Sequence, residues 1–433
     1  MRTTVKTGLT TAGLAALLLG SSAGLAQVAC SEDAQGAQIG YWNGFSGPDG
    51  EFMTQLVNSF NEQNEQGVQV NMTIQPASEY YNTINAASAS KTLPDVLQIH
   101  LDQVATQAVR ATIRPMPETL LSDLGISADA YPEAVWNGTE YNGERYSLPL
   151  DIHPLVMWYN RDDWTAAGLE DPAGRTLTAE EYEAALTALS EGGGDAVAWS
   201  VTTGFPITWM FETLLYQFGG DRFNQDGTEV AFNSEAGFQA LTYLLESQEA
   251  FSRDNLPVDA GITAFKQGQS ETEWNGTWQL SNLTGEGFQP GWGAPLPNIG
   301  GEYVVTAGAH TLALGNTAAE DPAKTAAAGC LIGYLSTNSL EWVTGAGHIP
   351  ANTTVRESSE FQALEPQASY ALMADAAIFP PTIPGITDAL APLDQAVQAV
   401  MTGQMTDVQT ALDEAAAQGN QILEQNRQRY GGN

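Results

Sequence analysis

Aromatic side chains beside amides and glycines are the residues of this chain whose chemistry is most informative. The clearest group is the run Glu-Trp-Asn-Gly-Thr-Trp at 273–278, and others are Trp-Asn-Gly-Phe at 42–45 and the tyrosine pair at 80–81. Indole rings pack on the apolar faces of sugar rings, while Asn, Asp, Glu and His side chains pair with hydroxyl groups. A single tryptophan is about as often a core residue as a ligand contact. The neighbouring Gly44 and Gly276 favour loops over packed helix faces, and so favour ligand contacts here. These runs therefore indicate a sugar site.

Motifs for common catalytic chemistry are absent from the sequence. It has no GxSxG, HExxH or GxxxxGK[ST] pattern, and no local context marks out a catalytic pair among its 51 acidic residues. The histidines are His100, His153, His310 and His348. They are far apart in sequence, and although they could converge in space, single histidines more often hydrogen-bond or pack. We expect no catalytic residue, no metal and no cofactor.

Strand and helix patterns alternate along the first part of the chain. Strand patterns at 37–42, 68–74 and 94–99 are separated by helical patterns, one of them at 78–90. This order predicts an α/β lobe with a largely parallel sheet, and ligands of such sheets lie at the carboxyl ends of the strands. Here those ends carry Trp42, Asn43, Gln75, His100 and Asp102.

Two extended, proline-marked segments indicate crossings between lobes. They lie at 146–154 and 348–351, where proline is incompatible with a helix interior. Helical patterns lie on either side of the second of these segments, at 321–336 and 388–430. About 400 residues exceed what one hydrophobic core usually supports, so we expect two lobes.

The N-terminal segment is typical of an export signal. Residues 1–29 combine a basic start, a short apolar stretch and small residues, and the stretch is too short to span a membrane. Cys30 ends a sequence similar to a lipobox, which predicts lipidation there, and cleavage after Ala26 is the alternative. Cys330 is expected to be a buried free thiol, because a disulfide with Cys30 would exclude lipid on that residue.

The charge of the chain excludes several partners. With 51 acidic residues against 15 Lys and Arg, the net charge is −36. Such a field repels nucleic acid and acidic membrane surfaces, so any membrane contact would be through a lipid anchor. It also disfavours ligands that carry phosphates or several carboxylates.

Several segments, in order, resemble the extracellular solute-binding proteins of bacterial ABC importers, in particular the carbohydrate-binding group that includes maltose-type receptors. The resemblance covers the chain from about residue 37 onwards. Its segments are 41–50 (Tyr-Trp-Asn-Gly-Phe-Ser-Gly-Pro-Asp-Gly), 93–96 (Leu-Pro-Asp-Val), 146–160, 265–278 and 348–351 (His-Ile-Pro-Ala).

The resemblance implies a two-lobed periplasmic-binding-protein fold of the class II type, with a hinge and a ligand cleft between the lobes. The expected divisions are a signal peptide (1–29), a tether (30–36), an N-lobe (37–150, with a return segment at about 306–350) and a C-lobe (151–305, with C-terminal helices at about 351–433). The resemblance also implies a protein that is not an enzyme, works in the periplasm or on the outer face of the cytoplasmic membrane, and delivers a sugar to permease subunits. We expect a monomer.

The expected ligand contacts come from both lobes. Trp42, Asn43 and Phe45 would line the N-lobe wall. Tyr80, His100 and Asp102 would approach from neighbouring strand ends, and Asp151 and His153 would lie where the hinge enters the C-lobe. The C-lobe wall would consist of Trp209, Trp274, Asn275 and Trp278, and His310 would reach the cleft from the returning strand.

Two other functions fit parts of the sequence. A receptor for glycerol phosphate, a polyol or a compatible solute would share the opening segment, and a phosphate would need Arg145, Arg161 or Arg222 in the cleft. An exported glycoside hydrolase would need a carboxylate pair facing a bound sugar.

Overall fold

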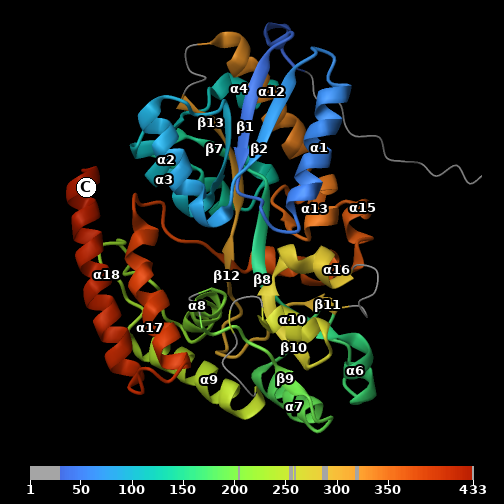
Figure 1. Ribbon diagram of the computed structural model, residues 1–433, viewed down its shortest axis with the longest axis vertical. Coiled ribbons are helices and arrows are strands. Elements are labelled where there is room, and N and C mark those ends of the chain that lie inside the picture. Colours follow the sequence, from blue (N-terminus) through green and yellow to red (C-terminus); the bar gives the residue numbers. More distant parts are fainter. Residues whose placement is uncertain are drawn as a thin grey trace, which may run out of the picture.

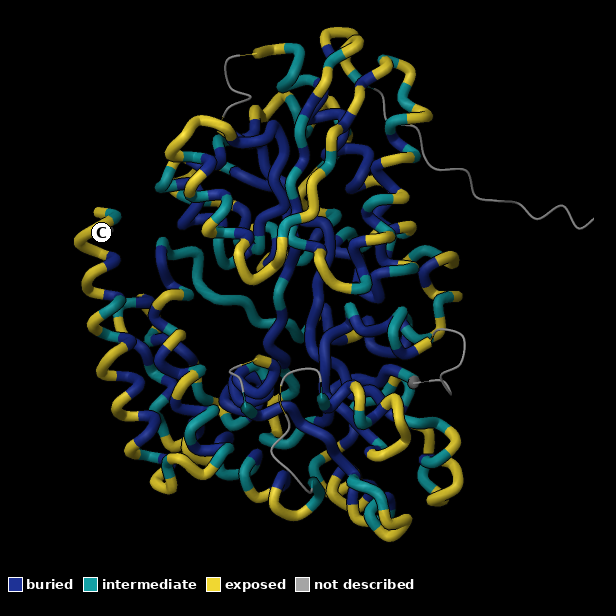
Figure 2. The backbone as a smooth tube through the Cα atoms, viewed as in Figure 1, coloured by how far each residue is buried: buried dark blue, intermediate teal, exposed yellow. Residues whose placement is uncertain are grey.

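The protein folds into two α/β lobes in the computed structural model (Figure 1). The structure describes residues 30–202, 205–252, 257, 260–284, 291–316 and 321–431. The predicted signal peptide lies outside these residues. Each lobe has buried strands at its centre and exposed helix surfaces outside (Figure 2). No helix in the described ranges is both long and apolar enough to cross a membrane.

The N-lobe is built on a mixed sheet. Strand order is β2-β1-β3-β13-β4, with β7 beside β13. The first three strands are parallel, and β13 is antiparallel to β3, β4 and β7. The expectation of a largely parallel sheet is thus only partly right, because β13 returns from the other lobe in the opposite direction. The strands are β1 (Gln38–Asn43), β2 (Gln69–Ile74), β3 (Val96–His100), β4 (Ile113–Arg114), β7 (Ser147–Pro149) and β13 (His310–Gly315).

Helices cover both faces of this sheet. Successive strand residues point to opposite faces, so Val96 packs toward α1 and α12, whereas Leu97 and Ile99 pack toward α2 and α3. The N-lobe helices are α1 (Gly50–Gln63), α2 (Tyr80–Ser90), α3 (Val104–Val109), α4 (Glu118–Asp123), α5 (Glu133–Gly138), α12 (Pro322–Thr337) and α13 (Ser339–Ala346). A short hairpin joins β5 (Glu140–Tyr141) to β6 (Glu144–Arg145).

The C-lobe is organised around the long strand β8 (Asp151–Asn160), which is antiparallel to its partners β10, β11, β12 and β14. The other strands are β9 (Asp195–Val197), β10 (Ser270–Gly276), β11 (Gly291–Ala294), β12 (Val305–Gly308), β14 (Ile349–Pro350) and β15 (Ala377–Ile378). The chain passes between the sheets at Leu150, which separates β7 from β8, and at Ala309, which separates β12 from β13. These passages place the ends of strands from both sheets beside one another.

Helices surround the β8 sheet. Helices α17 and α18 pack on each other along one side of the molecule (Figure 1). The helices of this part of the chain are α6 (Arg161–Ala166), α7 (Ala179–Ser190), α8 (Ile207–Gln217), α9 (Glu235–Phe251), α10 (Ala260–Lys266), α11 (Leu280–Thr284), α14 (Thr353–Arg356), α15 (Ser359–Gln362), α16 (Glu365–Tyr370), α17 (Ala391–Met401) and α18 (Val408–Tyr430).

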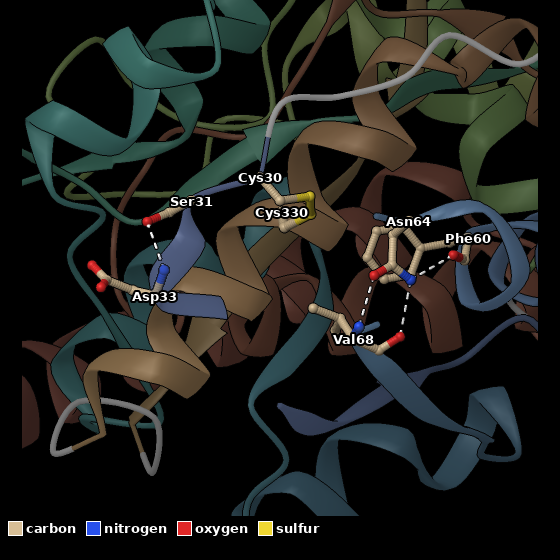
Figure 3. The surroundings of a disulfide bond; sticks show 7 residues. All are labelled: Cys30, Ser31, Asp33, Phe60, Asn64, Val68 and Cys330. Atoms are coloured by element: carbon tan, nitrogen blue, oxygen red, sulfur yellow. Dashed lines mark hydrogen bonds between the residues drawn. A yellow bond between two sulfur atoms is a disulfide. The ribbon is translucent and has the colours of Figure 1, made fainter. Parts of the chain in front are cut away.

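A disulfide joins the start of the described chain to α12 of the N-lobe. Cys30 pairs with Cys330, with Cα atoms 5.1 Å apart (Figure 3). The expectation of a free thiol at Cys330 is therefore wrong. The predicted lipidation of Cys30 would need the sulfur atom that forms this bond, so the pairing and lipidation exclude each other. The sequence could not show the proximity, because 300 residues separate the two cysteines.

Candidate functional site

A cavity of about 620 Å³ lies where the two lobes meet. From the N-lobe it is lined by the residues that follow β1, by the start of α2 and by the end of β3. From the C-lobe it is lined by residues of β8, α8, η5 (Thr277–Gln279) and the start of α17. Its size falls within the range of roughly 300–1,000 Å³ that is usual for small-molecule sites. The carboxyl ends of strands therefore meet at a cavity, as expected for this kind of sheet.

Three aromatic rings form one part of the cavity wall. The ring centroid of Trp209 lies 5.6 Å from that of Phe205 and 6.5 Å from that of Trp278, and the Phe205 and Trp278 centroids are 5.7 Å apart. Phe205 precedes α8, Trp209 lies in the first turn of that helix, and Trp278 follows the end of β10. All three line the cavity, so apolar ring surface is available to a ligand.

Trp274 does not belong to this wall, which corrects its predicted position. The side chain is fully buried and packs against Tyr182 and Trp199 inside the C-lobe. The reason is that β10 is an interior strand, paired with β8 and β9, so that its residues are covered on both faces. Asn275 is also buried in the strand, where its amide donates to Glu273. The glycine-marked tryptophan at the strand end, Trp278, is the one that reaches the cavity.

Trp42, Asn43 and Tyr80 are likewise absent from the cavity wall. The Tyr80 hydroxyl donates to the carbonyl oxygens of Trp42 and Gln98, which fixes α2 on the sheet, and Asn43 is fully buried. The neighbouring Tyr81 lines the cavity instead, because consecutive helix residues point about 100° apart. Phe45, beyond the end of β1, does line the cavity, as do His100 and Asp102 after β3.

The four histidines lie close together at the cavity. The His153 and His310 rings stack with centroids 4.0 Å apart, and His100 and His348 lie 4.8 Å and 5.3 Å from His310. Strand register explains part of this, because His310 on β13 is the partner of His100 on β3. The sequence left open whether these histidines converge in space, and the structure brings them together. Their gathering depends on tertiary pairing that their spacing in the sequence does not reveal.

Asp151 lies behind two of these rings and does not line the cavity. Its carboxylate accepts hydrogen bonds from Nδ1 of His153 at 2.9 Å, from Nδ1 of His310 at 2.9 Å and from Nε1 of Trp342 at 2.7 Å. The backbone N–H of His310 donates to it as well, at 3.3 Å. Burial opposes charge on Asp151, but the imidazoles around it and these hydrogen bonds hold the pKa of its carboxyl well below the usual value.

Burial also disfavours charge on the imidazoles, and for these groups that lowers the pKa. It lowers the pKa of His100 to about 4 and also lowers the pKa of His153 and of His310. The three rings are therefore neutral at pH 7. Because the Asp151 carboxylate only accepts hydrogen bonds, the protons of His153 and His310 are on Nδ1 and their Nε2 atoms carry a lone pair.

A buried ion pair forms the wall beside α8. Arg222 donates from Nη1 to Glu212 at 2.9 Å and from Nε to the Tyr216 hydroxyl at 2.9 Å. Burial raises the pKa of Glu212 and of Asp102 in the same wall. Arg222 is paired with the buried Glu212 carboxyl at 2.9 Å, so its guanidinium is not a free positive charge in the cavity wall. Arg145 and Arg161 are not among the residues that line it.

Several buried polar atoms of the cavity residues have no hydrogen-bond partner within the described residues. They are Nε2 of Gln98, Nη2 of Arg222, Oγ1 of Thr306 and Nε2 of His348. A buried polar atom without a partner costs on the order of 1–3 kcal/mol, so a group of them in one cavity wall favours a polar ligand that pairs with them.

The cavity is also lined by residues that were not among the individual ligand contacts expected from the sequence, namely Tyr81, Gln98, Phe205, Glu212 and Thr306. Two of these positions could have been suspected from the sequence. Tyr81 belongs to the tyrosine pair, and Phe205 is an aromatic residue directly before Pro206, where a loop is expected. From the sequence alone, an acidic residue inside a helix such as α8 is expected to be a solvated surface group. In the structure, Glu212 is instead buried against Arg222.

The fold and the cavity together define a two-lobed protein with a cavity of small-molecule size between its lobes. The chain belongs to the bacterial extracellular solute-binding proteins, whose family model matches residues 55–368.

Named relatives agree with this assignment. The maltodextrin-binding protein MdxE of Bacillus subtilis (strain 168) is 24% identical over 301 residues, which are 67% of this chain and 69% of that protein. The galactooligosaccharide-binding protein of the same organism is 23% identical over 387 residues, 81% of this chain and 82% of that protein. Among solved structures, the sugar-binding protein MalE from Xanthomonas citri has a TM-score of 0.77 at 17% identity, covering 92% of this chain and 100% of that chain. At 17% identity, the similarity to this solved structure shows a shared fold and nothing further.

Proposed function

We propose that this protein is the extracytoplasmic substrate-binding component of an ABC importer, and that it captures a neutral sugar or oligosaccharide between its lobes. The observation that carries the proposal is that one cavity combines exposed aromatic faces with buried polar atoms that have no hydrogen-bond partner in the described part of the chain. A sugar matches both features of the wall. Its apolar ring faces pack on aromatic rings, and its hydroxyls donate and accept hydrogen bonds with the polar atoms.

The proposed ligand contacts follow from the cavity wall. Of the residues named from the sequence, we retain Phe45, His100, Asp102, His153, Trp209, Trp278 and His310. Asp151 becomes a positioning residue, because it holds the rings of His153 and His310 without reaching the cavity itself.

The remaining parts of the proposal concern the whole protein. We propose that residues 37–150 with the return at about 306–350, together with the disulfide-bonded segment at 30–36, act as one rigid lobe. Residues 151–305 with the helices at about 351–433 would act as the other. Closure of the two lobes around the sugar would present the loaded form to the permease subunits. We also propose that the protein acts as a monomer and catalyses no reaction on its ligand.

An anionic ligand is disfavoured by the same wall. Arg222 is the cation that a phosphate would require, but it is already paired with Glu212 and lies near Asp102. A phosphate placed there would meet these carboxyl groups as well as the guanidinium.

A thermal-shift screen tests the proposal, because a ligand that binds only the folded state raises the melting temperature. The panel contains monosaccharides, maltodextrins, galactooligosaccharides, polyols and glycerol 3-phosphate. We expect the shift with a saccharide. A shift with glycerol 3-phosphate alone would replace the proposed ligand class, and shorter products after incubation with oligosaccharides would identify a hydrolase instead.

Isothermal titration of a Trp278→Leu variant with the best saccharide tests the site. Loss of a main ring contact is expected to cost on the order of 1–3 kcal/mol, which is a loss of affinity of about 5- to 150-fold. The matched control is Trp136→Leu, because Trp136 is partly exposed in the N-lobe and does not line the cavity. Equal affinities of the two variants would show that Trp278 is not part of the sugar site.

A further inference from the structure

All the histidines of the 433-residue chain meet at one place. His100, His153, His310 and His348 come from separate segments of the sequence, and all line the interlobe cavity. Hydrogen bonding to a sugar explains one or two histidines in a wall. It does not explain why imidazoles are gathered here and found nowhere else in the sequence.

The four rings are held in the same way. The Nδ1 atoms of His153 and His310 donate to Asp151. Nδ1 of His100 is hydrogen-bonded to the Tyr81 hydroxyl at 2.8 Å, and Nδ1 of His348 to Oγ1 of Thr277 at 3.0 Å.

Each ring is thus oriented through Nδ1, and Nε2 makes no hydrogen bond to any described residue. For His348, Nε2 is buried without a hydrogen-bond partner among the described residues, and the nearest carboxylate, that of Asp49, is 3.7 Å away. In metal sites, ligating histidines are held in this manner, because a carboxylate or another group fixes Nδ1 and sets the tautomer that exposes Nε2.

The spacing of the rings suits a single ion. Nitrogen atoms of His100, His153 and His310 all lie within 4.8 Å of one another. A tetrahedral ion with nitrogen ligands at about 2.0–2.1 Å holds imidazole centroids about 5 Å apart. The three centroid separations are 4.0, 4.8 and 5.8 Å, which bracket that value.

We propose that His100, His153 and His310 form a binding site for a divalent late transition metal ion such as Zn²⁺ or Co²⁺. Imidazole ligands select these ions over Mg²⁺ and Ca²⁺, which prefer oxygen. Three protein ligands leave the fourth position to water or to a hydroxyl of a molecule in the cavity. Asp151 and Tyr81 act as positioning residues behind the ligands. This site goes beyond the proposed sugar binding and does not depend on it.

The test uses the metal alone and protein without a histidine tag. After treatment with EDTA and its removal, Co²⁺ and then Zn²⁺ are titrated in the presence of excess Mg²⁺, which occupies the acidic surface. We expect one equivalent of Co²⁺ to bind with the visible absorption of a tetrahedral site and to be displaced by Zn²⁺. Ring-nitrogen NMR gives a direct readout, because every imidazole signal comes from this cluster and the signals of His100, His153 and His310 should shift or broaden.

Variants separate the site from general affinity for cations. His100→Gln and His310→Gln should weaken Co²⁺ binding by at least 10-fold, and Tyr81→Phe by about 10- to 100-fold through loss of a group that orients a ligand. Asp226→Asn, at an exposed turn outside the cavity, is the control and should bind as the unmodified protein does. Circular dichroism checks that each variant is folded.

Three results would overturn the proposal. They are displacement of Co²⁺ by Mg²⁺, imidazole signals that do not respond to metal, and unchanged metal affinity in a folded His100→Gln variant. Because no sugar is present, failure here leaves the thermal-shift result for saccharides untouched, and failure of the sugar screen leaves the metal titration untouched.

Discussion

Removal of the Asp151 carboxylate should destabilise the protein, because this group connects segments that pass between the lobes. Asp151 begins β8, and the donors to its carboxylate come from His153 on the same strand, from His310 at the start of β13 and from Trp342 on α13. All of these groups are buried. In an Asp151→Ala variant they would lose their acceptor without gaining water.

The size of the effect can be worked out donor by donor. The imidazoles can move their protons to Nε2, but the indole N–H of Trp342 and the backbone N–H of His310 cannot rearrange. Each buried donor left without a partner costs about 1–3 kcal/mol, so Asp151→Ala should lower the free energy of unfolding by about 2–6 kcal/mol. Asp151→Asn keeps one acceptor oxygen for Trp342 and should lower it by about half as much.

Urea unfolding followed by tryptophan fluorescence measures this difference, with Asp226→Ala at an exposed turn as the control for loss of a carboxylate. An Asp151→Ala protein that unfolds within about 0.5 kcal/mol of the unmodified protein would refute the reasoning, since it would mean that the buried donors find other partners.

Two further changes have defined outcomes. Cys30→Ser should lower the free energy of unfolding by about 2–5 kcal/mol, the usual cost of removing a native disulfide, because the bond between residues 300 positions apart restricts the unfolded chain. A reductant should bring the unmodified protein to the same urea midpoint, and insensitivity to reductant would contradict this. Three causes raise the pKa of Glu271 from 4.5 to about 7, namely burial, a hydrogen bond with Asp163 and the negative charge of Asp163. The stabilisation by the neutral acid is complete below pH 4.5 and is lost as the pH rises through 7. Glu271→Gln should therefore unfold at a higher temperature than the unmodified protein at pH 8 but not at pH 5, whereas an exposed control, Glu229→Gln, should show no such pH-dependent difference.

Local patterns were sufficient to predict several strands and helices of the fold, although the helical pattern at 388–430 is divided into α17 and α18. The alternation at 68–74 corresponds to β2, and the proline-marked run at 146–154 contains Leu150, where the chain leaves one sheet for the other. These signals are local because a strand that faces a core on one side must alternate, and because proline excludes a helix. The strand order could not be obtained in this way, since the antiparallel placement of β13 depends on where the chain returns after about 160 residues.

The choice among aromatic residues required the fold. Trp274 and Trp278 lie four residues apart in one polar run, yet one is in the core and the other at the cavity. The distinction is where β10 ends, at Gly276, because a side chain inside an interior strand is covered on both faces and a side chain beyond its end is not. The tyrosine pair shows the same limit for a helix, since a rotation of about 100° per residue decides that Tyr81 faces the cavity and Tyr80 the sheet.

The histidine cluster shows how a site arises from strand ends that are distant in sequence. Parallel strands bring their carboxyl ends to one edge of a sheet, so the end of β3 delivers His100 to the cavity. An antiparallel strand brings its amino end to that edge, and β13 begins there with His310. The neighbouring strand β12 ends at the same place, opposite His153 of β8. A residue at the first position of a returning strand is therefore as well placed for ligand or metal binding as one at the last position of an outgoing strand. The sequence can give both positions, but only the register between strands shows that they meet.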